Sequence, residues 1–359
     1  MNAKKKIRFA QLSFWFGHAY GICNVAKVNP LSELICVWDE NEDRGEQAAK
    51  RFEVEYMKNL DELLARDDID AVGIACPTQK HIELIEMAAK AGKHCFVEKP
   101  FTRTAQEAER AVKAAEKYGV QMMPVYNLRF TPAFQKMKEI VDSGDLGTLY
   151  QVRRRHGHDI YHRLNYDAEA IMNDPDWPWL DAHGEGRDAL YHAGSHAVLW
   201  MLWMFGMPQS VSAVGSNIVK DLPVADNHAD VFRYDSGLLV TLHLSETETA
   251  APLAAEIYGT EGALVQIRGD HPSTRAVCGT DQALMMYTRE TNEWQAIPGL
   301  SSEFQPNTRG SSAAWPFFEA LAEGREVPVS VYDGRDCMMV LDAAERSAQE
   351  RIEITISGR

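Results

Sequence analysis

The sequence predicts an α/β protein of two domains, the first built on a doubly wound parallel sheet and the second an α+β domain with a mostly antiparallel sheet. Its 359 residues exceed what a single hydrophobic core usually supports. Short apolar runs alternate with helical segments up to about residue 126, whereas beyond that point apolar runs succeed one another through turns. We therefore expect domains of residues 1–126 and 127–359.

In the first domain, five apolar runs have the length and composition of buried strands. They cover residues 7–12, 34–38, 70–76, 93–99 and 120–125. The helices between them begin near Gly17, cover about 44–52 and 81–92, and start at the capping box Thr104–Glu107. Strands joined in this way by helices form a parallel sheet with helices on both faces, which is the Rossmann-type arrangement.

In the second domain, successive strands and turns predict a mostly antiparallel sheet. The expected strands cover residues 149–156, 210–217, 232–244, 255–267, 284–297 and 352–356. Turns are expected at Asp235–Gly237 and Glu290–Asn292, within two of these runs. One helix of residues 188–205 is apolar on all sides, so its Trp200 and Trp203 are expected in the core, and a last helix covers about 335–349.

The composition excludes several classes of protein. The chain is 45% hydrophobic and 25% charged, with 52 acidic and 37 basic residues and a net charge of −15, so we expect a globular protein and no nucleic-acid partner. No apolar run approaches the length of a membrane span or of a signal peptide, so we expect a cytoplasmic protein without a membrane partner. The six cysteines form no CxxC pair and are expected to be buried free thiols.

The turn after the first strand, Ser13–His18, occupies the place of a dinucleotide-binding glycine loop but lacks the GxGxxG pattern. Trp15 stands where a glycine would let the backbone approach a pyrophosphate. A helix N-terminus with His18 beside it remains, and it can hold an anion. Asp39 ends the second strand, where an acid binds the adenosine ribose and favours NAD over NADP; an ordinary turn aspartate is the alternative.

The tripeptide Glu98-Lys99-Pro100 and the segment Cys76–His81 follow neighbouring strands at their carboxyl ends, where open α/β sheets bind ligands. Taken with further matching segments in the same order along the chain, these residues resemble the glucose–fructose oxidoreductase/inositol dehydrogenase/MocA-like (GFO/IDH/MocA) oxidoreductase family. The resemblance covers nearly the whole chain. It includes the segments YNLRFTPAFQKMKEIVDSGDLGTLYQVR, EIYGTEGAL and FFEALAEGREVPVSVYDGRDCMMVLDAAERSA.

The resemblance implies NAD as the cofactor and a set of cofactor-binding positions. These are Ser13, Phe14, Trp15, Gly17, His18, Asp39, Pro77, Thr78, His81, Glu98, Lys99 and Asn127. A second family motif, DxGxH, corresponds to residues 192–196, where His196 takes the position of the family's histidine and His192 that of its aspartate. We assign Lys99, His196 and His192 to catalysis.

The segment of residues 156–188 is rich in aromatic, histidine, acidic and arginine side chains, which suit the C–H faces and hydroxyl rim of a sugar ring. A surface loop or a subunit-interface arm is an equal alternative. The expected substrate-binding residues are Lys99, His156, His158, Trp177, Trp179, His192 and His196.

His192 and His196 also have the i, i+4 spacing of metal ligands, to which His156, His158 and Asp159 could add. The stretch lacks a glutamate between its histidines and any fixed spacing to a third ligand, so we expect no metal. It stays open whether His192 orients the substrate or binds an ion.

Together these features favour an NAD-dependent dehydrogenase that oxidises a secondary alcohol of a sugar, glycoside or cyclitol. His196 would take the hydroxyl proton and Lys99 would stabilise the developing alkoxide. Two alternatives stay open: a glycoside-cleaving enzyme that uses transient oxidation and elimination, and a sugar- or NAD-sensing regulator without activity. The expected partners are a carbohydrate or polyol and further copies of the chain, as a homodimer or homotetramer formed through the C-terminal sheet.

Overall fold

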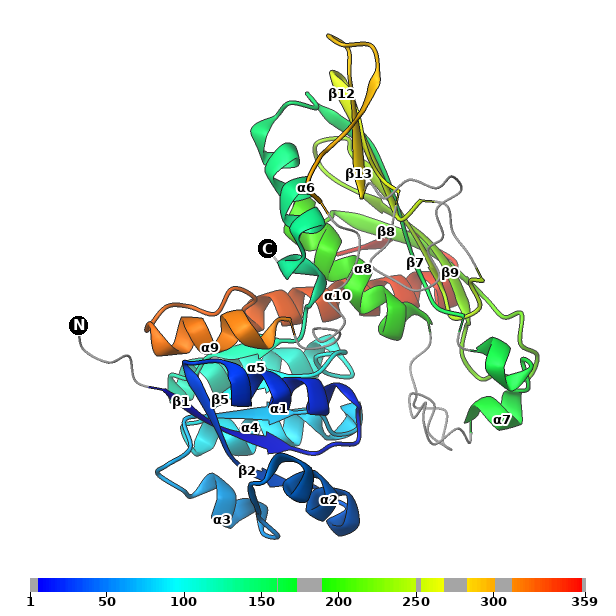
Figure 1. Cartoon of the computed structure of the whole chain (residues 1–359). Helices are drawn as coiled ribbons and strands as arrows, with labels where there is room; N and C mark the ends of the chain where they lie inside the picture. Colours follow the sequence, from blue (N-terminus) through cyan, green and yellow to red (C-terminus); the bar gives the residue numbers. More distant parts are fainter. Residues whose placement is uncertain are drawn as a thin grey trace. The chain divides into compact units, whose positions relative to one another are not determined.

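The computed structural model describes residues 6–159, 161–172, 189–249, 253–267, 283–300 and 312–356. The chain divides into two units, each described here by itself (Figure 1). Unit 1 comprises Met1–Asn127 and Gln305–Met338, and unit 2 comprises Leu128–Phe304 and Met339–Arg359. This division differs from the expected domains in two respects: Asn127 belongs to the N-terminal unit, and a segment near the C-terminus joins that unit.

Unit 1 contains a six-stranded parallel sheet in the order β3-β2-β1-β4-β5-β6. The strands are β1 (Ile7–Leu12), β2 (Ser32–Trp38), β3 (Glu55–Tyr56), β4 (Ala71–Ile74), β5 (His94–Val97) and β6 (Met122–Pro124). The helices are α1 (His18–Val28), α2 (Glu42–Phe52), α3 (Leu60–Leu64), α4 (His81–Lys90), α5 (Ala105–Tyr118) and α9 (Ala314–Ala322), with a 3-10 turn η1 (Thr78–Lys80). The predicted doubly wound fold is confirmed.

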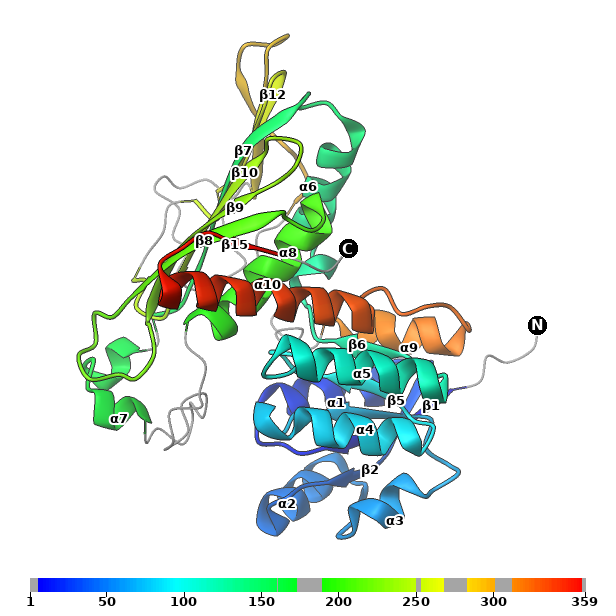
Figure 2. The same ribbon diagram turned by 180° about the vertical axis from the view of Figure 1, so that it is seen from behind.

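Helices cover both faces of this sheet. α4 packs against α5, and Figure 2 shows the two side by side in front of the strands, while α1 packs against α9. The Phe318 ring of α9 lies 5.1 Å from that of Phe9 on β1, and the Phe317 ring lies 5.1 Å from that of Phe96 on β5. Burial of these aromatic rings explains why a C-terminal segment belongs to unit 1.

Unit 2 contains a nine-stranded sheet in the order β14-β13-β12-β11-β7-β10-β9-β8-β15. The strands are β7 (Leu149–Gly157), β8 (Ser210–Ser216), β9 (Asn227–Arg233), β10 (Leu239–Ser245), β11 (Ala255–Gly259), β12 (Gly262–Gln266), β13 (Leu284–Thr288), β14 (Trp294–Ala296) and β15 (Ile354–Thr355). Adjacent strands are antiparallel except β7 and β10, which pair in parallel. The predicted mostly antiparallel sheet is confirmed.

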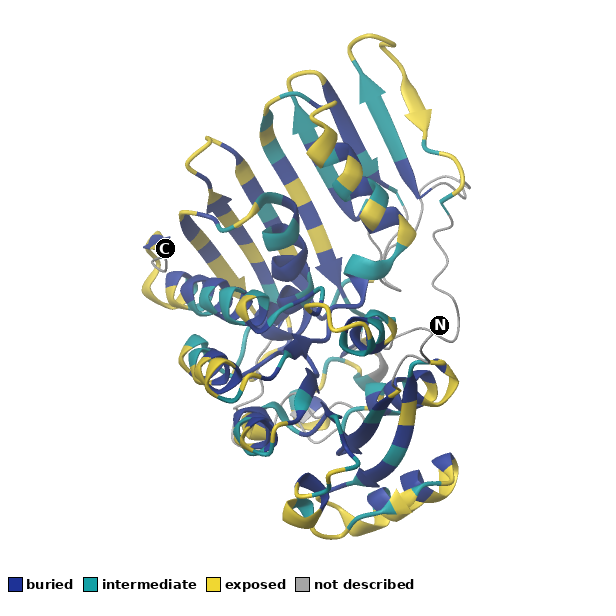
Figure 3. Ribbon diagram, turned by 90° about the vertical axis from the view of Figure 1, so that its left-hand side faces the viewer, coloured by how far each residue is buried: buried dark blue, intermediate teal, exposed yellow. Residues whose placement is uncertain are grey.

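The helices of unit 2 are α6 (Pro132–Ser143), α7 (Ala168–Met172) and α8 (Ala189–Phe205), with 3-10 turns η2 (Leu128–Phe130) and η3 (Tyr161–Leu164). A further helix, α10 (Val331–Glu350), begins in unit 1 and continues into unit 2 from Met339. α8 packs on β7, β9 and β10. Figure 3 shows alternating buried and exposed residues along the strands of the larger sheet, as expected when helices cover only one of its faces. Trp200 is buried as predicted, whereas Trp203 is only half-buried.

The described cysteines are buried free thiols, as the sequence predicted. They are Cys23, Cys36, Cys76, Cys95 and Cys337, while Cys278 lies outside the described residues. Burial raises the pKa of Cys36 and Cys95 to about 12, so neither is a thiolate at neutral pH. In the described part of the chain, the helices are too short or too polar to cross a membrane.

Candidate functional sites of the two units

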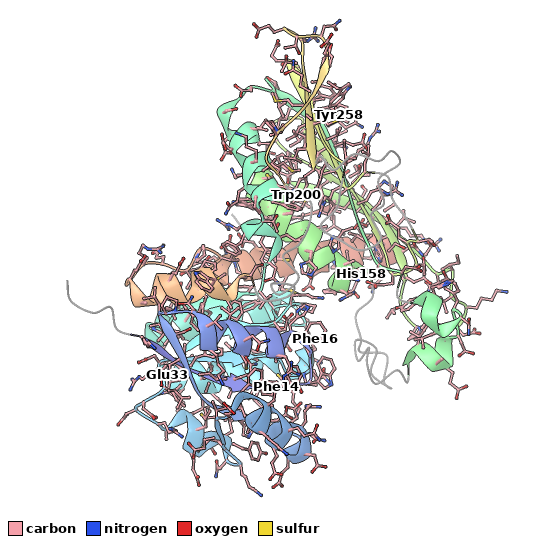
Figure 4. All side chains as sticks on the ribbon, viewed as in Figure 1. Phe14, Phe16, Glu33, His158, Trp200 and Tyr258 are labelled. Carbon is pink, nitrogen blue, oxygen red and sulfur yellow. The ribbon has the colours of Figure 1, made fainter. Side chains whose placement is uncertain are left out.

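The turn between β1 and α1 lacks a glycine-rich loop, and its first residue, Ser13, has a positive φ angle. Ser13 is buried with φ +66°, and its hydroxyl donates to Glu40 Oε1 (3.0 Å) while it accepts the N–H of Trp15 (3.1 Å). Gly17 is exposed, and no atom lies within 4 Å of the position that a Cβ would take there. The side chains of Phe14 and Phe16 are labelled at this turn in Figure 4. The turn therefore leaves open space at the N-terminus of α1, where backbone N–H groups can bind an anion.

Asp39, at the end of β2, is buried and fully hydrogen-bonded. Its carboxylate accepts the backbone N–H of Phe14 and of Asn41, both at 2.7 Å, and two bonds from Arg44, from Nε at 2.9 Å and Nη2 at 2.8 Å. Arg44 Nη2 also lies 2.6 Å from Glu40 Oε1. Burial lowers the pKa of Arg44, but Asp39 and Glu40 outweigh it and raise that pKa overall. Asp39, the acid expected to bind the ribose, is therefore paired with Arg44, a cation that the sequence analysis did not predict.

Glu98 and Lys99 follow β5 and meet the first turn. Glu98 is buried, with Oε1 2.7 Å from His18 Nδ1 and Oε2 accepting the N–H of Lys99 (2.8 Å). Burial alone would raise the pKa of Glu98, but His18 and Lys99 lower it below its ordinary value. Lys99 is buried too, and its Nζ lies 5.5 Å from the ring centre of Phe16. Glu98 therefore remains ionised beside the lysine.

The loops after β4 and β6 hold the other predicted cofactor positions of unit 1. Pro77 and Thr78 are half-buried at the start of η1. His81 is buried between two backbone carbonyls, with Nε2 3.0 Å from Cys76 O and Nδ1 3.2 Å from Phe101 O, and burial lowers its pKa. Its ring therefore joins the two loops that follow β4 and β5.

Asn127 lies at the end of the N-terminal segment, where it also makes a structural contact. Its Oδ1 accepts the N–H of Ala313 at 3.0 Å, the residue that precedes α9. Asn127 thus anchors α9 at the edge of unit 1.

Unit 2 gathers four histidines, which we call the four-histidine cluster: His156, His158, His192 and His196. His156 is the second-last residue of β7, and His158 directly follows that strand. His192 and His196 lie one turn apart on α8. Ring centres are 4.5 Å apart for His158 and His192, 5.2 Å for His156 and His196, and 5.6 Å for His156 and His158. His158 is among the residues labelled in Figure 4. The predicted shared face of His192 and His196 is therefore the face that meets β7.

Glu246 completes this group and was not predicted. It is buried directly after β10, and its Oε1 lies 2.7 Å from Nδ1 of His192. Its backbone N–H donates to the carbonyl of Asp226 (2.9 Å). The only sequence signal was an acid placed directly after an alternating strand, which is common on protein surfaces.

The structure brings most predicted site residues together within each unit. In unit 1, Ser13, Phe14 and Asp39 form one connected group, and His18, Glu98 and Lys99 form a second. In unit 2 the expected histidines form the four-histidine cluster. Trp177 and Trp179 lie outside the described residues, so their expected role in substrate binding stays a prediction.

The residues of unit 1 fit a dinucleotide. The open N-terminus of α1 suits a pyrophosphate, and the acids Asp39 and Glu40 follow β2, where ribose hydroxyls are bound in such folds. Lys99 at the end of β5 stands where ligands of open parallel sheets are held.

Comparison with known proteins agrees with this assignment. Residues 15–126 match the model of the oxidoreductase family with an NAD-binding Rossmann fold, and residues 134–265 match the GFO/IDH/MocA C-terminal domain. The chain is 36% identical over 340 residues to the uncharacterized oxidoreductase YrbE of Bacillus subtilis, covering 93% of this chain and 92% of that one. It is 26% identical over 361 residues to the scyllo-inositol 2-dehydrogenase (NADP(+)) IolW of the same organism, covering 94% of each.

Among solved structures, the complex of levoglucosan dehydrogenase with NADH and levoglucosan has the same fold. It superposes with a TM-score of 0.81 at 21% identity, covering 99% of this chain and 100% of that one. The chain therefore belongs to the GFO/IDH/MocA oxidoreductase family, with unit 1 as its NAD-binding Rossmann domain.

Proposed function

We propose that the protein is an NAD-dependent dehydrogenase that oxidises a secondary alcohol of a sugar, glycoside or cyclitol. The observation that carries this proposal is the four-histidine cluster, in which half-buried His196 shares a helix face with a histidine bound to a buried glutamate. Relatives named as scyllo-inositol 2-dehydrogenase and levoglucosan dehydrogenase support a polyhydroxylated substrate.

His196 is the proposed general base. Its imidazole is half-buried and therefore accessible, and an imidazole can take a hydroxyl proton near neutral pH. His192 is held by Glu246, and its proposed role is to orient the substrate. NAD+, when bound, would supply the acceptor for the hydride that leaves the substrate carbon.

Lys99 is the proposed stabiliser of the alkoxide. An ammonium group placed at a developing oxyanion lowers the barrier because its attraction grows as the charge forms. Glu98 fixes the backbone of Lys99 through its N–H, and it balances the positive charge of that buried side chain.

We further propose that the enzyme prefers NAD to NADP. Asp39 and Glu40 present two carboxylates at the end of β2 against one guanidinium, so the local charge repels an additional phosphate. Arg44 weakens this repulsion compared with an unpaired Asp39.

We also propose that copies of the chain associate through the uncovered face of the larger sheet. Val214, Val231 and Leu239 are exposed there at 68%, 41% and 39%, on neighbouring strands. The same face carries Arg153 and Arg233, so the proposed contact is apolar with charged surroundings.

The proposed reaction is tested by incubating the full chain and NAD+ with a panel of inositols, monosaccharides and glycosides. NADH formation is followed by absorbance, and products by chromatography. We expect NADH and a ketone with the carbon skeleton and any glycosidic bond intact. Glycoside cleavage without net NADH would favour the elimination mechanism, and binding without turnover across the panel would favour a sensor.

A further inference from the structure

We infer that His158, His192 and Glu246 form a binding site for one divalent transition-metal ion within unit 2. One potential ligand atom of each residue lies within 4.8 Å of those of the other two. Two imidazole nitrogens and a carboxylate oxygen are a donor set that proteins use for zinc and neighbouring first-row metals. The three residues come from the end of β7, from α8 and from the segment after β10, so the site exists only in the folded chain.

Backbone hydrogen bonds hold two of the three ligands in place. The N–H of His158 donates to the carbonyl of Ser245 (2.7 Å), and its own carbonyl accepts the N–H of Glu248 (2.7 Å). The N–H of Glu246 donates to the carbonyl of Asp226 (2.9 Å). The segments after β7 and β10 therefore run side by side, and each presents one ligand from a fixed backbone.

Two glycines allow the three segments to approach. A Cβ on Gly157 would lie 2.8 Å from Cβ of Glu248, and a Cβ on Gly194 would lie 2.8 Å from Cδ1 of Leu244. Both distances are shorter than ordinary van der Waals contact, so a larger residue at either position would force its neighbour to move. Because His192 lies two residues before Gly194 on α8, this close packing brings it to the segment after β10.

The distance between His192 and Glu246 suits an ion that takes the place of the proton between their ligand atoms. His192 Nδ1 and Glu246 Oε1 are 2.7 Å apart, as in a hydrogen bond. Ligand atoms bound to one metal at about 2.0–2.1 Å are about 3.0–3.4 Å apart, so this pair has to open only slightly. As the ion enters, the proton on Nδ1 of a neutral His192 would pass to Nε2 of the same ring, so that the imidazole stays neutral.

Burial differs among the three ligands. His192 and Glu246 are buried, whereas His158 is half-buried. A water molecule or hydroxyl can therefore complete the coordination from the side of His158. That a substrate hydroxyl takes this position rests on the proposed function, while binding of the ion does not.

A second buried pair in the same unit provides a matched control. His228 Nδ1 lies 3.4 Å from Asp230 Oδ1, and both side chains are buried. Among the described residues, no third histidine, cysteine or acid joins this pair to make a metal-binding group. It tests whether any buried histidine–carboxylate pair would bind the ion.

The experiment is a titration of the full chain with Co²⁺, after removal of metals by a chelator and verification by elemental analysis. Binding is followed by the visible absorption of bound Co²⁺. We expect one Co²⁺ per chain. His158→Gln and Glu246→Gln should weaken binding by more than about 100-fold, beyond the effect usual for an outer-shell partner, whereas His228→Asn should bind as wild type does.

Wild type that takes up no Co²⁺ at micromolar concentrations would overturn the site, as would unchanged affinity in both ligand variants. Circular dichroism verifies their folding, and His158→Gln changes a half-buried position, so loss of binding there cannot be attributed to a collapsed core. A chain that oxidises a polyol with NAD+ but takes up no Co²⁺ would contradict the metal site alone. A chain that binds Co²⁺ but oxidises no polyol would contradict the proposed function alone.

Discussion

Each unit buries a glutamate against a histidine at 2.7 Å, but the two pairs have different surroundings. In unit 1, Glu98 is 1% exposed while His18 is 31% exposed, and the backbone of Lys99 binds the same carboxylate. In unit 2, His192 and Glu246 are 3% and 2% exposed and lie among further imidazoles. The first pair keeps a carboxylate charged beside a lysine, whereas the second fixes one imidazole within a cluster. The same two residue types therefore serve charge balance in one unit and histidine orientation in the other.

The largest effect that we expect comes from the residues beside each pair. Lys99→Ala and His196→Ala should each lower kcat by about 10²–10⁴-fold, which corresponds to about 3–5 kcal/mol, because both act chiefly in the transition state. In His196→Ala, affinity for NAD, measured by fluorescence titration, should be nearly unchanged. An unaltered kcat in a folded His196→Ala protein would contradict the proposed base.

The pair in unit 1 should contribute to stability in a pH-dependent way. Glu98→Gln should lower the free energy of unfolding by about 1–3 kcal/mol at neutral pH, because a charged hydrogen-bond acceptor is lost inside the unit. The pKa of Glu98 is lowered from 4.5 in the folded chain, so its stabilisation is complete above that value and is lost as pH falls towards the lowered pKa.

Chemical denaturation of both proteins over a pH series measures this difference. The stabilities of wild type and Glu98→Gln should begin to converge as the pH falls below 4.5, and they should meet only below the lowered pKa of Glu98. A difference that grows on acidification would show that the carboxylate is not stabilised in its ionised form.

A third buried carboxylate, that of Asp39, differs from Glu98 and Glu246 because its partner, Arg44, is always charged. Asp39 is held by Arg44, so Arg44→Met should leave two acids without compensation and increase the preference for NAD over NADP. We expect a change of about tenfold or less in the ratio of kcat/KM values, because the ion pair is partly exposed. A shift of that ratio towards NADP would contradict the proposed charge argument.

Local patterns were sufficient for most of the fold. The apolar runs predicted β1 at residues 7–12 in full, because periodicity and composition act within a few residues. The parallel pairing of β7 with β10 and the packing of α9 on unit 1 were not predicted. Both depend on contacts between distant segments, such as the ring of Phe318 against that of Phe9.

The candidate site was predictable where one element carries two of its residues. The i, i+4 spacing placed His192 and His196 on one face of α8, and that face meets β7. Glu246 and Arg44 were missed, because their partners lie on other elements or across a turn. The expectation of no metal rested on sequence spacing and stays a prediction, which the proposed site of His158, His192 and Glu246 opposes.

The central claim, that hydride leaves a carbon of a polyol for NAD+, is tested most directly by isotope transfer. The full chain is incubated in ordinary water with NAD+ and a polyol from the panel that carries deuterium on every carbon, and the NADH is examined by mass spectrometry. We predict that all NADH formed is one mass unit heavier than the ordinary compound. NADH that carries only ordinary hydrogen, or no NADH with any polyol of the panel, would contradict the account.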